Sequence, residues 1–457
     1  MYSYLAKTID KSFVINLLFS LLIFSFIAGN LAVNINVMLI LITVTFYYKK
    51  RIFEFEVDNI DKIIIILFLY ILISGFVNNI FYWVEGYSND FKVLIKSILF
   101  LRFLLFYFVI KFLIINNIIN LKIFFLFSLG ATLFVSLDII YQFIFGYDIF
   151  GFKGMDRRLS GPFGDERIAG AFLQRFSLLS IFTLSIFFKI KNNYLQYMVI
   201  LFLTCLLLTA LVLSGNRIPL ILFLVTLIAL VIFEKELRKF FIPFALLISL
   251  LIYSISISIN YSPLSKNMYF HLTNFKTKAF QIFYILSPKN ILTKEEEERY
   301  LKEDLFYTFE YNGKRYKLNN THAKEFNFGI IAWKKNKYFG GGLKSSNIIC
   351  SKNSFLNCSN HPHNYYLEIL YTSGLIGFFL TLVLLTLVFY KTFIKKYFKN
   401  SKLNDNYIIT PFIFLFFSEM FPIKSTGSFF TTGNATYIFL ILSILVALSQ
   451  IKKTDKI

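Results

Sequence analysis

The sequence predicts an all-α polytopic membrane protein with about twelve transmembrane helices and one large external α+β loop domain. Of its 457 residues, 57% are hydrophobic and only 16% are charged, whereas a soluble domain averages about 25% charged residues. The mean hydropathy is +0.64, and the apolar residues gather in runs close to the roughly 20 residues that cross a bilayer. This pattern excludes an ordinary soluble enzyme, a disordered chain and a collagen-like fibre.

Twelve apolar runs are the candidate membrane helices. The first is followed at once by another run and has no small-residue cleavage site, so we interpret it as a retained helix and not as a removed signal peptide. Nine helices then fall in residues 1–259, an external loop domain in 260–362 and three helices in 363–457. The runs are 12–29, 31–48, 63–77, 93–115, 123–145, 168–188, 194–213, 218–233, 240–259, 363–390, 407–421 and 435–449.

The basic residues predict that both termini are cytoplasmic. With this orientation the termini and the inner turns hold 21 Lys and Arg residues, and the short outer turns hold eight. Short loops rich in Lys and Arg stay on the cytoplasmic side, whereas long domains escape this rule. The net charge of +21 therefore reflects membrane orientation, and no nucleic-acid partner is expected.

The external domain is predicted to contain a few short elements. Along this domain, a charged stretch, a stretch of alternating apolar and polar residues and an apolar stretch follow one another, with turn residues between them. The predicted elements are a helix 293–304 capped by Thr293, a β-hairpin 305–318 that turns at Asn312–Gly313, a helix 326–335 and a flexible turn at Gly340–Gly342.

The sharpest polar motif is His361-Pro362-His363-Asn364. Pro362 disfavours helix at His361 and Asn364 is a good N-cap, so we expect His363 at the mouth of a transmembrane helix. A helix N-terminus favours a neutral imidazole, which can accept a proton. His363 is therefore the candidate catalytic base, with the alternative that it only marks a solvated helix end. His361, Asn364 and Glu368 are supporting candidates.

No metal or other cofactor is expected. The spacing H-x-H is a weak zinc signal, because a third and a fourth ligand at familiar spacing are missing. The three cysteines are too few for a disulfide scaffold. Cys350 and Cys358 could form a disulfide in an oxidising compartment or remain two free thiols.

Arginines form the second candidate constellation. Charged groups near the hydrocarbon normally face a polar cavity, and a guanidinium can grip a diphosphate with two hydrogen bonds. The alternatives are pairing with nearby acidic residues and contact with lipid head groups. Asp138 and Glu419, which also lie in apolar runs, could shape a polar groove, relay protons or satisfy helix ends. The candidate diphosphate ligands are Arg158, Arg167, Arg175 and Arg217, with Arg102 as a supporting residue.

Three motifs together resemble the O-antigen ligase and O-antigen polymerase family of bacterial inner membranes. Ser-Gly-Asn-Arg at 214–217 is similar to the family's Ser-x-Arg element. Trp333 followed by Gly340–Gly342 is similar to its Trp and Gly-x-Gly stretch. His363-Asn364 with Leu367-Glu368 and Gly374–Gly377 is similar to its His-Asn-x-x-Leu and Gly-x-x-Gly helix. The likeness spans about 214–380. One departure is Gly329, where the family often has Arg; Arg315 or Lys324 could compensate.

The resemblance implies a glycosyltransferase of the bacterial inner membrane with its large loop in the periplasm. Its donor would be an undecaprenyl-diphosphate-linked glycan and its acceptor lipid A-core or a similar molecule. The transfer would be metal-independent and would invert the anomeric centre. A polymerase of O-antigen or exopolysaccharide repeat units is the alternative with the same chemistry, and a multi-pass transporter is the alternative of another class.

Overall fold

The computed structural model describes most of the chain. The described residues are 11–54, 56–81, 91–154, 158–187, 193–235, 253, 291–296, 298, 308–311, 313–317, 321–346, 361–399, 403, 406–422, 424 and 427–451.

The described elements are almost all helices. In chain order they are α2 (Lys11–Ala28), α3 (Asn30–Tyr48), η1 (Lys49–Phe53), α4 (Asn59–Phe81), α5 (Lys92–Ile115), α6 (Leu121–Phe145), η2 (Gly161–Phe163), α7 (Ala169–Ile186), α8 (Asn193–Leu213), α9 (Arg217–Phe233), β1 (Thr308–Tyr311), β2 (Lys314–Lys317), α15 (Thr321–Lys335), α17 (Tyr365–Phe389), η6 (Tyr390–Ile394), α18 (Lys395–Tyr397), α19 (Ile409–Glu419) and α20 (Thr432–Gln450).

The prediction of a multi-pass, mostly helical membrane protein is confirmed. Within the described residues, nine helices are long and apolar enough to cross a membrane, and α9 and α19 are apolar but shorter. Every predicted run except 240–259, of which only residue 253 is described, coincides with a helix. The total of twelve spans and the domain boundaries stay predictions.

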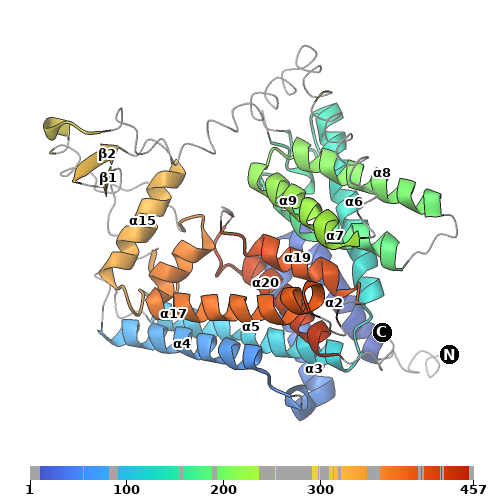
Figure 1. The fold of residues 1–457 in the computed structure, drawn as a ribbon, viewed down its shortest axis with the longest axis horizontal. Helices are drawn as coiled ribbons and strands as arrows, with labels where there is room; N and C mark the ends of the chain where they lie inside the picture. The colour runs from blue at the N-terminus through green and yellow to red at the C-terminus, as the bar shows by residue number, and fades with distance from the viewer. Residues whose placement is uncertain are drawn as a thin grey trace.

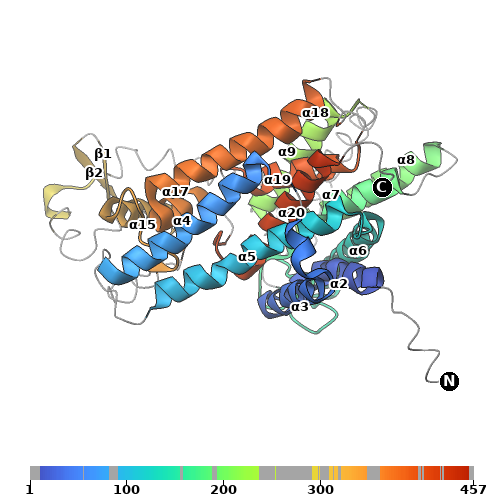
Figure 2. The same ribbon diagram turned by 90° about the horizontal axis from the view of Figure 1, so that it is seen from below.

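Long helices form the body of the molecule. Figures 1 and 2 show α4, α5 and α17 running side by side, with α20 packed against α5. Another group contains α6, α7, α8 and α9, and α19 lies between α7 and α20. The helix α15 crosses the end of α17 that begins at Tyr365, and the hairpin β1–β2 lies beyond it (Figure 1).

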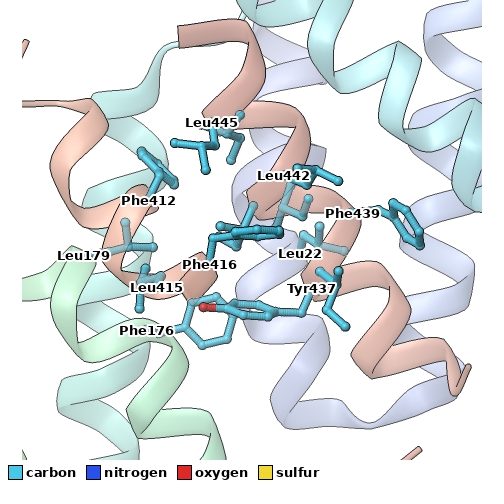
Figure 3. Packing of buried hydrophobic residues seen from close by; sticks show 14 of the residues in the cluster. Leu22, Phe176, Leu179, Phe412, Leu415, Phe416, Tyr437, Phe439, Leu442 and Leu445 are labelled. Carbon is cyan, nitrogen blue, oxygen red and sulfur yellow. The ribbon is translucent and has the colours of Figure 1, made fainter. Parts of the chain in front are cut away.

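Aromatic and aliphatic side chains fill the space between α2, α7, α19 and α20 (Figure 3). Phe176 lies against Tyr437 with ring centroids 5.5 Å apart, and both side chains are fully buried. The Tyr437 hydroxyl donates to the backbone oxygen of Arg175 at 2.9 Å. This packing fixes the depth of α7 relative to α20, which matters for the arginine on α7.

Ion pairs tie the helices together at the end opposite α15. Lys391, after α17, binds Asp58 at 2.7 Å just before α4 begins. Lys111 on α5 binds Asp61 at 2.5 Å, and both side chains are fully buried. Tyr107 also donates to Asp61, at 2.7 Å. These contacts join the start of α4 to α5 and to the end of α17, so the three helices are fixed to one another at this end.

The described parts of residues 260–362 match the predicted elements. β1 and β2 pair antiparallel with Tyr311 opposite Lys314, as expected for the hairpin. Thr293 caps a helical turn, because its hydroxyl accepts from Glu296 N at 3.3 Å and Glu296 accepts from Thr293 N at 3.0 Å. α15 begins at Thr321 and ends at Lys335, earlier at its start than the predicted 326.

The prediction of a flexible turn after α15 is wrong. Residues 337–342, called the glycine loop below, pair with α17 where that helix is broken at Gly374, whose φ is 63° and ψ −168°. Gly341 N and Gly342 N donate to the carbonyls of Tyr371 and Thr372, both at 2.8 Å. In return, Leu375 N donates to Lys337 O at 2.9 Å. The loop therefore satisfies backbone groups that the break would leave unpaired in an apolar environment.

Side chains of α4 hold the glycine loop from its other side. Tyr70 donates to the carbonyls of Ser373 at 2.8 Å and Phe339 at 3.2 Å. Ser74 also donates to Phe339 O, at 3.1 Å, and Asn78 donates to Gly340 O at 3.0 Å. These three α4 residues are four apart, so they form one face of the helix. The loop is thus clamped between α4 and α17.

Replacing Gly374 by alanine is expected to destabilise the protein by about 2–3 kcal/mol, because the backbone there is strained for any residue with a Cβ. An added Cβ would also meet Tyr338 O at 2.2 Å. Thermal unfolding of the purified protein in detergent measures the loss. The matched control is Gly130→Ala on α6, where nothing lies within 4 Å and helix propensity favours alanine by about 1 kcal/mol. Equal stability of the two variants would contradict the pinned loop.

Candidate active site

His363 lies at the mouth of α17, as the sequence predicted. Asn364 is the N-cap, and its side chain accepts from Leu367 N at 3.1 Å. The same side chain donates to Pro422 O at 2.8 Å, which ties the helix start to the segment after α19. His363 itself has a φ of 52°, a left-handed conformation that costs energy for a residue with a Cβ. Such strain is typical of functional sites.

Two side chains flank the His363 ring. Glu325 on α15 lies with Oε1 3.5 Å from His363 Nε2. The ring of His361 packs against the ring of His363, with the two ring centroids 4.2 Å apart. The His363 side chain remains 28% exposed, whereas that of Glu325 is 10% exposed. The imidazole is therefore open to a substrate and has a carboxylate beside one nitrogen.

His361 differs from His363 in its surroundings. Burial lowers its pKa to about 4, and the neighbouring His363 contributes in the same direction. Its Nε2 is buried and has no hydrogen-bond partner among the described residues. His361 is therefore neutral at pH 7, and its ring packs against that of His363.

Glu368 lies one turn further along α17 and is buried. Its carboxylate accepts from the Ser428 hydroxyl at 2.5 Å and from Phe429 N at 2.6 Å. These contacts fix the segment that leads into α20 against the start of α17. The described contacts of the buried Glu368 carboxylate therefore hold this segment in place, and Glu368 positions the site.

Arg175 occupies the centre of a buried charged cluster. It lies in the second turn of α7 and binds Glu419 through Nη2 at 2.6 Å and Nε at 3.1 Å. Nη2 also donates to Asn434 Oδ1 at 2.6 Å and approaches the Tyr365 hydroxyl at 3.5 Å. No described residue accepts a hydrogen bond from Nη1, and the side chain is 10% exposed. The guanidinium is thus oriented by Glu419, with one amino group left over.

Lys424 adds a second positive charge to this cluster. It binds Glu419 directly and lies 3.4 Å from Gln174 Oε1. Burial lowers its pKa to about 8, although Glu419 opposes the shift. Two cations therefore share one carboxylate, so the cluster carries a net positive charge at pH 7.

Arg102 and Arg175 converge on the first turn of α20. Arg102 Nη2 donates to Thr432 Oγ1 at 3.2 Å, and Arg175 binds Asn434, two residues further along. The N-terminus of a helix carries a partial positive charge and favours anions. Two guanidinium groups and a helix N-terminus thus concentrate positive potential at one place.

Arg217 is the first residue of α9 and follows the cap Asn216. The start of α7 packs against this turn, because a Cβ on Gly170 would lie 2.6 Å from both Asn216 Cβ and Ser214 Oγ. Arg175 follows Gly170 by five residues, about 7.5 Å along the helix. α7 therefore connects the turn before Arg217 with Tyr365, two residues after His363.

The other candidates lie on further segments of the described chain. Arg158 is half-buried in the segment between α6 and α7, and Arg167 is exposed two residues before α7. Arg315 lies on β2 opposite Glu310. Gly329, where the family often has Arg, lies against Pro362, since a Cβ would be 3.3 Å from that ring. Cys350 and Cys358 lie outside the described residues.

Sequence reasoning missed several members of the site. Glu325, Tyr365, Lys424 and Asn434 have ordinary sequence surroundings, and only Glu419 stood out, as an acid in an apolar run. Among the described residues, no three His, Cys, Asp or Glu side chains gather closely enough to hold a metal ion.

The part of the site around His363 lies within a segment that matches a known family, and the cluster around Arg175 lies outside it. The model of the O-antigen ligase family matches residues 201–382. The matched segment contains Arg217, α15, the glycine loop, His361, His363 and Glu368. The match confirms the resemblance seen in the sequence motifs. No curated protein matches the chain.

Proposed function

We propose that the chain, whose residues 201–382 match the O-antigen ligase family, is a membrane enzyme that transfers a glycan, with the following donor, acceptor and mechanism. The donor is an undecaprenyl-diphosphate-linked glycan. The acceptor is lipid A-core or a similar molecule on the outer face of the bacterial inner membrane, with both termini cytoplasmic and the loop periplasmic. The nine helices at 1–259, the loop domain at 260–362 and the three helices at 363–457 form its parts.

One observation carries the proposal. The His363 imidazole is partly exposed and has the Glu325 carboxylate beside it. Two residues along the chain, the Tyr365 hydroxyl donates to Oε1 of Glu419, the partner of Arg175, at 2.9 Å. A proton acceptor and a cationic cluster next to each other are what transfer from a diphosphate needs.

In the proposed reaction, His363 takes the proton of the acceptor hydroxyl. The oxygen forms a bond to the anomeric carbon, while the bond from that carbon to the diphosphate oxygen breaks. The leaving undecaprenyl diphosphate keeps the electron pair, and the configuration inverts because attack comes from the opposite face. The leaving group is already stable as an anion, so the reaction proceeds without metal or nucleotide.

The positive groups stabilise the departing diphosphate. Arg175 offers Nη1, while Glu419 fixes the orientation of its guanidinium. Arg102 and the first turn of α20 extend the same positive region. Arg217, Arg158 and Arg167 bind the diphosphate or guide it from the side of α7, and Arg315 contributes from the hairpin.

Glu325 acts as a positioning residue for His363. Glu325→Gln is expected to lower kcat by about 10- to 100-fold, as losses of a partner that orients a functional histidine do. The donor KM should stay unchanged, and the acid limb of the pH–rate profile should move to lower pH because the imidazolium loses its counter-charge. Steady-state kinetics from pH 5 to pH 9 measure this, with the exposed Glu295→Gln as the control. An unchanged pH profile would refute the role of Glu325.

Arg217→Lys is expected to lower kcat/KM for the donor by about 10- to 100-fold, because an ammonium cannot reproduce a fork that makes two charge-assisted hydrogen bonds of about 1.5–3 kcal/mol each. Initial rates at low donor concentration measure the loss. Arg51→Lys, an exposed change in η1, is the matched control and should behave as wild type. Wild-type kinetics for Arg217→Lys would move diphosphate recognition elsewhere.

Repeat-unit polymerisation uses the same residues, with a second carrier-linked glycan as acceptor. The test is transfer by purified protein with carrier-linked glycan, without metal or nucleotide, in the presence and in the absence of lipid A-core. Product on lipid A-core supports ligation, and carrier-linked oligomers support polymerisation. Movement of intact donor across the bilayer without transfer would instead favour the transporter and refute the proposal.

A further inference from the structure

The glycine loop presents two exposed aromatic side chains next to three lysines. Tyr338 is 64% exposed and Phe339 is 43% exposed. Lys334 and Lys335 end α15 and Lys337 follows, and all three are exposed. The Trp333 indole donates to Lys337 O at 3.0 Å, which fixes the chain between the helix and the loop.

The aromatic pair lies between two apolar surfaces of the membrane helices. Ile376 N donates to Tyr338 O at 3.3 Å, and Ile376 and Phe379 on α17 are exposed. On α4, Ser74 binds Phe339 O, and its neighbour Ile73 is 58% exposed. Since the outward faces of both helices contact lipid, the two ring side chains continue one lipid-facing surface.

The depth of the loop follows from helix geometry. Lys391 and Asp58 mark the opposite membrane boundary, where their pair ties α17 to α4. Gly374 lies 17 residues before Lys391, which is about 25 Å at the helical rise. A hydrocarbon core is about 30 Å thick. The loop that pairs with Gly374 therefore sits at the outer edge of the hydrocarbon, on the side of α15 and His363.

We propose that residues 334–339 bind the surface of that leaflet, with Tyr338 and Phe339 inserted at the edge of the hydrocarbon and the three lysines on anionic phospholipid head groups. Aromatic rings prefer this level of the bilayer. Lysine side chains near it extend toward the phosphates, and each adds about 1 kcal/mol of attraction to an anionic surface. The interaction fixes the loop domain, and with it Glu325 on α15, at a set height above the membrane.

Site-directed fluorescence tests the insertion. Tyr338→Cys and Phe339→Cys, each in a full-length protein whose Cys205, Cys350 and Cys358 are serine, carry an environment-sensitive dye in phosphatidylcholine nanodiscs. We expect lipid bearing a nitroxide high on its chain to quench both dyes and aqueous iodide to leave them bright. Lys314→Cys on the exposed hairpin is the matched control and should show the reverse. Iodide quenching at 338 and 339 equal to that at 314 overturns the proposal.

The same label at 339 tests the lipid class. Head-group nitroxides on phosphatidylglycerol and on phosphatidylcholine are compared at equal low fractions. Stronger quenching by the anionic lipid, lost when Lys334, Lys335 and Lys337 are all changed to Gln, supports the role of the lysines. Equal quenching by the two lipids overturns it. No readout uses glycan transfer, so the outcome is independent of the proposed function.

Discussion

Replacing His363 by alanine is expected to abolish detectable glycan transfer, with a fall in kcat of about 10²- to 10⁴-fold, the usual contribution of general base catalysis. The reason is geometric. The His363 side chain is 28% exposed and has Glu325 beside it, whereas the low pKa of His361 makes it a poor base. Single-turnover assays with purified protein and carrier-linked glycan measure the change.

A second variant separates chemistry from folding. The φ of 52° at His363 suits asparagine, which adopts left-handed conformations more readily than most residues. His363→Asn should therefore fold normally, remain in the membrane at normal abundance and still be inactive. Activity near the wild-type level in either variant would remove His363 from the mechanism and leave its position at a solvated helix end as the remaining explanation.

Replacing Arg175 by methionine is expected to destabilise the protein by about 3–5 kcal/mol, because it leaves the buried Glu419 with fewer partners. Arg175 provides two of the contacts to that carboxylate, and Lys424 and the Tyr365 hydroxyl provide the others. The same change should also remove donor binding, since Nη1 is the proposed contact to the diphosphate. Thermal unfolding in detergent and the donor KM measure the two effects separately.

Lys111→Met is the matched control for that change. It breaks the buried pair with Asp61 on the opposite side of the membrane domain, and we expect a similar loss of stability. Transfer per folded molecule should remain at the wild-type level in Lys111→Met and be lost in Arg175→Met. If both variants retained normal kinetics once folded, Arg175 would be a structural residue and no part of the diphosphate site.

Local sequence patterns predicted the parts of the fold that depend on local physics. Apolar runs between charged turns identify membrane helices because unpaired backbone groups cannot lie in hydrocarbon. Asn364 was identifiable as a helix cap because a side-chain oxygen that accepts a backbone N–H has a short list of candidates. The hairpin at Thr308–Lys317 followed from its Asn-Gly turn in the same way.

Pairings over long sequence separations were not predictable in this way. Arg175 and Glu419 lie 244 residues apart, and no local sequence pattern around either residue predicts that they pair. The break at Gly374 depends on a loop more than 30 residues earlier, whose backbone replaces the lost helical hydrogen bonds. Three consecutive glycines suggested flexibility because the sequence does not show which backbone they approach. Here their missing side chains allow a close approach to α17.

The glycine loop also relates the two halves of the proposed mechanism. α15 carries Glu325 and leads directly into the loop, and the loop is pinned to α17, which carries His363 at its start. The carboxylate and the imidazole therefore belong to one structural unit. A change at Gly374 should therefore lower activity as well as stability.

The most direct test is a cryo-electron microscopy structure of the protein in nanodiscs with a non-transferable undecaprenyl-diphosphate glycan bound. We expect the diphosphate at the first turn of α20, within hydrogen-bond distance of Arg175 Nη1, with Arg217 on its other side and the His363 imidazole facing the anomeric carbon. Density for the diphosphate on the opposite side of the membrane, or away from both arginines and from His363, would contradict the account.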